Sequence, residues 1–125
     1  MARYDPRVVA AAIGVQESWL SSILTRFSVL GVSRGRQGRT RTLTREAVLC
    51  LAVARDLIAD AGANTESALA LAHELIRRPD GRLRVGTNGL EIRCDLELQR
   101  EQLRVALDLI VASAVEVPRG RPRGR

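Results

Sequence analysis

In the segment AAIGVQESWLSSIL, residues 11–24, one glycine separates two helical patterns. Before Gly14, the pair Asp5-Pro6 predicts the start of a helix, since a carboxylate cap followed by proline at the first helical position favours helix initiation. After the turn, apolar residues recur with helical spacing at Leu20, Ile23, Leu24 and Phe27. Two helices joined by so tight a turn predict a helix-turn-helix.

The second of these helices carries a row of small hydroxyl side chains opposite its apolar positions. Such a face can approach the major groove of DNA closely, where serine, threonine, glutamine and arginine bond to bases or phosphates. A plain solvated face is the alternative, and Trp19 can equally be a core residue beneath the first helix. The candidate DNA-binding residues here are Gln16, Ser18, Trp19, Ser21, Ser22, Thr25 and Arg26.

Residues 31–43, GVSRGRQGRTRTL, interrupt the helical pattern with glycines and arginines. The alternation in residues 39–43 suits a short strand, so we predict a loop or a small twisted hairpin. Beside a helix-turn-helix, this segment is expected to form a wing whose guanidinium groups contact phosphates or enter the minor groove. A flexible, solvated loop is the alternative. The wing arginines are Arg34, Arg36, Arg39 and Arg41.

Caps and stop signals predict two helices after this segment. The first starts at the Thr44 cap and stops at Gly62. The second starts at Asn64 or Thr65 and ends at Arg78, because a proline-containing turn follows. The chain up to residue 78 is therefore predicted to form one mainly α unit.

Residues 82–94, RLRVGTNGLEIRC, predict a β-hairpin around an Asn88-Gly89 type I′ turn. That turn sets Val85 opposite Ile92, with apolar residues on one face and arginines on the other. A last helix is expected over residues 95–114. Its apolar stripe suits packing on another helix, and we predict that it forms a dimer contact. The stripe includes Leu96, Leu103, Leu107 and Ile110.

Three stretches give residues 6–77 a family resemblance. They are AAIGVQESWLSSIL (11–24), GRTRTLTREAV (38–48) and LIADAGANTESALAL (57–71). They resemble the patterns A-x-x-x-G-V-S-x-x-T-L-R-Y-Y-E, G-Y-R-x-Y-x-x-x-x-L and L-x-x-x-G-x-S-L-x-x-I of MerR-family regulators. The resemblance implies a winged helix-turn-helix that binds DNA, with Arg41 in the place of the wing arginine.

The sequence also departs from that family. Ser21 and Ser22 replace an arginine and a tyrosine of the family's second helix, and Thr40 replaces the tyrosine of the wing. Members commonly place a long dimerisation helix directly after this domain, followed by an effector site. Here the hairpin at residues 82–94 comes first, and no recognisable effector module follows.

Charge is unevenly distributed along the chain. The formal net charge is +6, and all twenty basic residues are arginine. Residues 1–45 and 118–125 carry the whole positive excess, whereas the segment between them is net acidic. Clustered positive charge of this kind favours a polyanionic partner. A genome rich in G and C, which favours arginine codons, is the plain alternative.

The last eight residues, PRGRPRGR, resemble an AT-hook, a short clamp for the minor groove. Glycine and proline keep such a chain slim, so that arginines can lie along the narrow, negative minor groove of A·T-rich DNA. A disordered solubilising tail or an RNA-binding segment is the alternative. The tail residues are Arg119, Arg121, Arg123 and Arg125.

Several functions are not expected. One histidine, no lysine and no glycine-rich phosphate loop argue against an enzyme. Cys50 and Cys94, with only His73 in addition, argue against a metal site, and no cofactor is expected. The apolar runs are too short for a membrane span, and the N-terminus lacks a signal-peptide core, which favours a cytoplasmic, nucleoid-associated protein.

Together these patterns predict a mainly α protein with three parts. They are a winged helix-turn-helix (1–78), a β-hairpin with an oligomerisation helix (79–117) and a basic tail (118–125). The expected function is sequence-preferring binding of double-stranded DNA, A·T-rich DNA included, by a small transcriptional regulator that forms a homodimer or a higher homo-oligomer. The alternatives are an architectural, plasmid-partition or phage-type DNA-coating protein and a protein-interaction module with incidental DNA contact.

Overall fold

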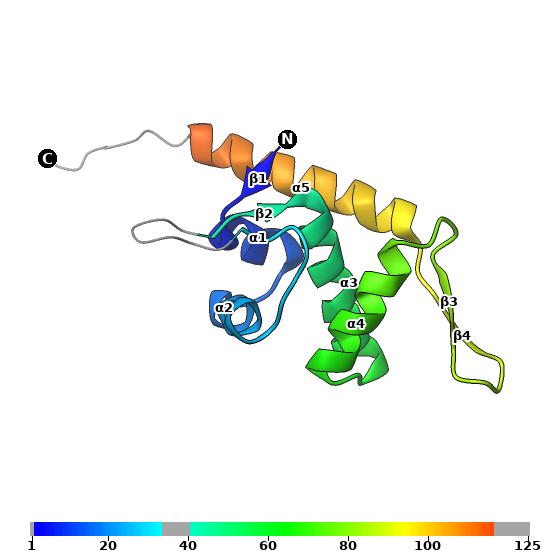
Figure 1. Ribbon diagram of the computed structural model, residues 1–125. Coiled ribbons are helices and arrows are strands. Elements are labelled where there is room, and N and C mark those ends of the chain that lie inside the picture. The colour runs from blue at the N-terminus through cyan, green and yellow to red at the C-terminus, as the bar shows by residue number, and fades with distance from the viewer. Residues whose placement is uncertain (1, 34–40, 117–125) are drawn as a thin grey trace, which may run out of the picture.

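The structure, a computed structural model, describes residues 2–33 and 41–116 of the 125-residue chain. Within these ranges it has five helices and two small antiparallel sheets, which confirms the mainly α class (Figure 1). In chain order the elements are β1 (Arg3–Tyr4), α1 (Pro6–Ile13), α2 (Glu17–Arg26), β2 (Leu43–Thr44), α3 (Arg45–Ala61), α4 (Thr65–Ile76), β3 (Arg82–Val85), β4 (Leu90–Arg93) and α5 (Leu96–Glu116).

The first two helices form where the sequence predicts them. Asp5 Oδ1 accepts a hydrogen bond from the backbone N–H of Arg7 at 2.7 Å and so caps α1. Gly14 ends this helix with a φ of 73°, a left-handed conformation that glycine adopts without steric cost. The chain re-enters helical geometry at Glu17, and the directions of α1 and α2 differ by 118°.

The caps of α3 and α4 also match their predictions. Thr44 Oγ1 accepts from the N–H of Ala47 at 3.2 Å, and Asn64 Oδ1 accepts from the N–H of Ser67 at 2.8 Å. The predicted end of α4 at Arg78 is wrong by two residues. The last turn tightens there, because the Arg78 N–H donates to the carbonyl of Leu75, three residues back, at 3.0 Å.

A short sheet that the sequence did not predict joins the N-terminus to the base of the wing segment. β1 pairs antiparallel with β2, so that Tyr4 lies opposite Leu43. On the other side of Leu43, Val32 forms an isolated antiparallel bridge. These contacts bring the two ends of segment 34–40 together. The segment itself lies outside the described residues.

The hairpin β3–β4 has a different register from the predicted one. Val85 pairs with Leu90, and Leu83 pairs with Ile92, whereas the Asn88-Gly89 turn would set Val85 opposite Ile92. The connection is a four-residue loop, residues 86–89. Because the shift is two residues, which is the side-chain period of a strand, the predicted apolar face is kept.

α3 lies at the centre of the core, and α1, α4 and α5 all pack against it. Every residue from Ala47 to Ala54 is buried. α5 crosses α1 and α3 (Figure 1). The predicted boundary at residue 78 therefore does not separate two cores, since leucines of α5 complete the core of the first 78 residues.

The predicted role of the α5 stripe in dimer formation is wrong for its three leucines. Leu96, Leu103 and Leu107 are only 7, 5 and 0% exposed, because they pack inside their own chain. Ile110 is half-buried. A hydrogen bond from Gln99 Nε2 to Asp56 Oδ2 at 2.7 Å further joins α5 to α3. The side chains of these leucines are thus not available to a second subunit.

Candidate nucleic-acid interface

The predicted hydroxyl row of α2 lies on the surface. Ser18, Ser21, Ser22 and Thr25 are all exposed, as are Gln16 and Arg26. On the opposite side of the helix, Leu20 and Ile23 are 0 and 3% exposed and anchor α2 in the core. A helix held by one face in this way presents a rigid, small-residue surface on the other.

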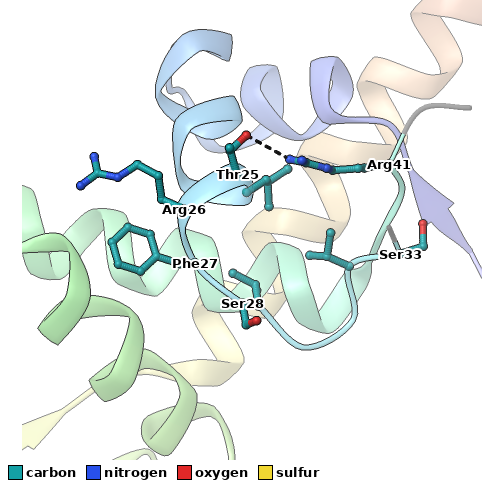
Figure 2. Close-up of a pocket in the computed structure, with 9 residues that line it drawn as sticks. Thr25, Arg26, Phe27, Ser28, Ser33 and Arg41 are labelled. Carbon is teal, nitrogen blue, oxygen red and sulfur yellow. Dashed lines mark hydrogen bonds between the residues drawn. The ribbon is translucent and has the colours of Figure 1, made fainter. Parts of the chain in front are cut away.

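Arg41 joins the base of the wing segment to this surface. Its Nη1 donates to Thr25 Oγ1 at 3.5 Å, a contact at the limit of hydrogen-bond length (Figure 2). Arg26 extends away from Arg41 (Figure 2), with its guanidinium carbon 5.6 Å from the centroid of the Phe27 ring. The two guanidinium groups therefore flank the last turn of α2.

Backbone pairing fixes the position of Arg41. The Ser33 N–H donates to the Thr42 carbonyl at 2.9 Å, and the Thr44 N–H donates to the Gly31 carbonyl at 2.9 Å. The Thr42 N–H donates to Ser33 Oγ at 3.1 Å. Residues 31–33 and 41–44 therefore form a paired stem, which we call the wing stem, directly beside α2.

Arg3 stabilises the wing stem and was missed as a site residue. Its Nε donates to Thr42 Oγ1 at 2.8 Å, and its Nη2 donates to the carbonyls of Thr42 and Gly31 at 3.1 and 3.2 Å. The positive cluster in residues 1–45 included Arg3. No sequence signal, however, indicated that a two-residue strand would reach the wing stem from 39 positions away.

A depression of about 440 Å³ lies between the end of α2 and the wing stem. Its lining is largely polar and includes Thr25, Ser28, Ser33 and Arg41 (Figure 2). Hydroxyl groups with a guanidinium at the rim form a suitable surface for an oxyanion such as a phosphate.

Trp19 lies at the edge of the core. It is half-buried and lines an open, apolar surface depression of about 300 Å³ together with Val15, Ile58 and Ala59. Trp19 thus lies beside residues of α3 and is only partly exposed.

Arg45 belongs to the positive cluster of residues 1–45 but was not among the candidate residues, and it lies away from the hydroxyl row. It donates a hydrogen bond to Tyr4 Oη at 2.7 Å, and its Nη2 lies 4.0 Å from Asp108 Oδ1 on α5. The remaining candidates lie outside the described residues. They are Arg34, Arg36 and Arg39 of the wing and Arg119, Arg121, Arg123 and Arg125 of the tail.

Cys50 is buried, Cys94 is half-buried, and the pKa of each thiol is raised. Burial, and to a smaller extent the charge of Glu46, raises the pKa of the Cys50 thiol to about 11. Burial and nearby aspartates also raise the pKa of Cys94. Among the residues that the structure describes, no three His, Cys, Asp or Glu side chains are placed to hold a metal ion.

We expect Cys50 to make stability fall at high pH. In the unfolded chain its thiol ionises near pH 9.0, whereas in the folded chain it stays protonated until about pH 11. Its contribution is thus fully present below pH 9 and is lost as the pH rises to 11, a decrease of about 2–3 kcal/mol. Denaturant unfolding from pH 8 to 11 should show this decrease in the wild type and a shallower one in Cys50→Ala. Parallel pH profiles would contradict it.

Within the described ranges, no single helix is long and apolar enough to cross a membrane, and only the bent pair α1–α2 reaches that length and composition together. No protein-family model matches the chain, and no curated protein or solved structure matches it.

Proposed function

We propose that this chain binds double-stranded DNA through α2 and the wing stem, in the manner of a winged helix-turn-helix. The observation that carries the proposal is the shared surface of the hydroxyl row and Arg41, which meet at the contact between Arg41 Nη1 and Thr25 Oγ1. A helix that enters the major groove and a neighbouring hairpin that contacts the backbone need this arrangement.

The geometry of α1 and α2 supports this docking mode. Their change of direction, 118°, lies within the range of helix-turn-helix motifs. Because the exposed face of α2 carries only serine and threonine along its centre, its backbone can approach base edges closely. Ser21 and Ser22 are the residues best placed to contact bases, since they lie in the middle of the row.

Charge on this surface favours a polyanion. Arg26 and Arg41 flank the end of α2 (Figure 2). At the start of the helix, Glu17 Oε1 lies 4.0 Å from Arg7 Nε, and this arginine offsets the negative charge of the carboxylate. The other three wing arginines and the tail arginines carry further positive charge at positions outside the described residues. We therefore propose that the wing contacts phosphates and that the tail binds the minor groove of A·T-rich DNA as an AT-hook-like segment.

The biological role that we propose is a small, dimeric, non-enzymatic transcriptional regulator that resembles the MerR family. A DNA-coating protein would use the same surface. The two roles differ in binding behaviour, since a regulator favours a few sites, whereas a coating protein spreads cooperatively with little sequence preference.

A charge placed on the hydroxyl row tests the proposal. We expect Ser21→Glu to weaken binding to a mixed-sequence duplex by at least about tenfold at low salt, because it places a negative charge in the major groove between the two phosphate backbones. Ser67→Glu, at an exposed position in the first turn of α4, adds the same charge elsewhere and should leave affinity unchanged. Fluorescence anisotropy measures both. Equal affinities for the two variants would contradict the proposal.

Exposed apolar residues on α5 favour a second candidate, a protein-interaction module. Leu98, Val105 and Leu109 are 52, 42 and 64% exposed on the side away from the core. If the wild-type chain retards no duplex at low salt, this second candidate replaces the first.

A further inference from the structure

The hairpin β3–β4 presents one strand to the body and one to solvent. It projects from the helical body at the junction of α4 and α5 (Figure 1). β3 packs on α4, and its Leu83 is only 9% exposed. On β4, Leu90 is 64% exposed, and Glu91 and Arg93 are also exposed. β4 is therefore the more accessible edge strand.

The register shows which backbone groups of β4 point outward. The Cys94 N–H donates to the Gly81 carbonyl at 2.8 Å, which makes these two residues a hydrogen-bonded pair. Because bonded and non-bonded pairs alternate in an antiparallel ladder, Leu83↔Ile92 and Val85↔Leu90 are also bonded pairs. The N–H and C=O groups of Glu91 and Arg93 consequently point away from β3.

The outer edge of β3 has fewer free backbone groups than the outer edge of β4, because the outward N–H of Arg82 already donates to Asp80 Oδ1 at 3.1 Å. Within the described part of the chain, no third segment bonds to the outward backbone groups of Glu91 and Arg93. β4 is thus an edge with free pairing capacity, a feature that favours strand addition.

The charges along the hairpin are unbalanced. Arg84 lies opposite Glu91, a favourable pair, but Arg82 lies opposite Arg93. Like charges directly opposite each other destabilise an antiparallel pair. Among the described residues, no carboxylate lies within ion-pair distance of Arg93. A negative charge beside Arg93, on the free side of β4, would relieve this repulsion.

We propose that two copies of this chain associate by antiparallel pairing of β4 with β4, centred on Ile92. In this register Glu91 of each copy lies opposite Arg93 of the other, and these residues exchange both backbone bonds. Each Arg93 then stands between Arg82 of its own chain and Glu91 of the other. The same pairing through β3 would set arginines against arginines, so the charge pattern selects β4 and selects a second copy as its partner.

This interface is independent of DNA binding and differs from the predicted contact through the buried α5 stripe. It joins two hairpins into one four-stranded sheet, with the apolar side chains Leu90 and Ile92 of both copies on the same face. A short strand pair buries little area, so we expect association in the micromolar range.

Charge reversal tests the interface without DNA. In sedimentation equilibrium over a concentration series, we expect the wild type to dimerise. Glu91→Arg and Arg93→Glu, each of which sets like charges opposite each other twice, should raise the dissociation constant by at least about tenfold. The double variant Glu91→Arg/Arg93→Glu should restore association, since it exchanges the charges and keeps their complementarity. Glu66→Arg, at an exposed site on α4, is the matched control and should dimerise normally.

Thermal unfolding of each variant checks that the fold is retained, and a change in dimerisation without a loss of folding is the expected pattern. A wild-type monomer at all concentrations overturns the proposal. A dimer that survives both single reversals also overturns it, as does a dimer that is disrupted only by Leu109→Arg, which would place the interface on α5. The β4 pairing adds an interface to the dimer that the proposed role includes. Because no DNA is present, these outcomes test the dimer alone and leave DNA binding by α2 and the wing stem to the duplex-binding experiment.

Discussion

Replacing Arg41 with glutamate should lower the affinity for a DNA duplex by about 100-fold at low salt. Arg41 lies where the wing stem meets the last turn of α2, and its guanidinium reaches Thr25. A carboxylate there removes a phosphate donor and adds repulsion against the backbone. The slope of affinity against salt should also become shallower, by about one unit, because one phosphate contact is lost.

Two further variants show whether the loss of affinity depends on the shape of the Arg41 side chain and on its position. Arg41→Lys keeps the charge but not the planar fork, so its affinity should lie between those of the wild type and Arg41→Glu. Arg77→Glu, at an exposed position just after α4, makes the same charge change away from the proposed surface and should have little effect. If Arg41→Glu and Arg77→Glu weaken binding equally, only net charge matters, and the specific role of Arg41 is wrong.

Leu107→Ala should reduce the free energy of unfolding by about 2–5 kcal/mol, the cost of a large cavity in a packed core. Leu107 is 0% exposed and belongs to the core that α5 shares with the rest of the chain. The effect should appear as a lower midpoint in urea unfolding, with loss of structure across the whole chain rather than in α5 alone.

Leu109→Ala provides the internal comparison. Leu109 is 64% exposed, two residues along the same helix, so its truncation should change stability by no more than about 0.5 kcal/mol. If both variants lose equal stability, or if Leu107→Ala changes only the oligomeric state, α5 is not the core helix that the structure shows.

Local signals allowed much of the helical structure to be predicted. Asp5, Gly14, Thr44 and Gly62 act on the adjacent backbone, and each caps or ends a helix as expected. The spacing of apolar residues on α5 correctly predicted an apolar face. The expected packing of this face on a second subunit was wrong, because its leucines pack in the core of their own chain. Periodicity shows which face of a helix is apolar, and it does not show whether that face meets its own chain or another.

Pairing between segments far apart in the sequence accounts for most of the remaining differences between the predicted and the observed structure. β1 is only two residues long, so its pairing with β2 leaves no periodic pattern to detect. In the second hairpin, Asn88-Gly89 indicated a two-residue turn, but Gly86 and Gly89 both adopt positive φ and allow a four-residue loop. On the candidate interface, the exposed face of α2 was predictable from spacing alone, whereas the stabilising role of Arg3 required the three-dimensional contact.

The proposed function requires the α2 hydroxyl row and the wing stem to contact DNA. Titration of the isotope-labelled full-length chain with a short duplex, followed by amide chemical shifts, tests it directly. We predict that the largest shifts fall on residues 16–26, on residues 31–44 and on the tail, residues 118–125, with α4 and the β3–β4 hairpin little changed. Shifts concentrated on the hairpin or α5, or no shifts at low salt, would show that α2 and the wing stem do not bind DNA.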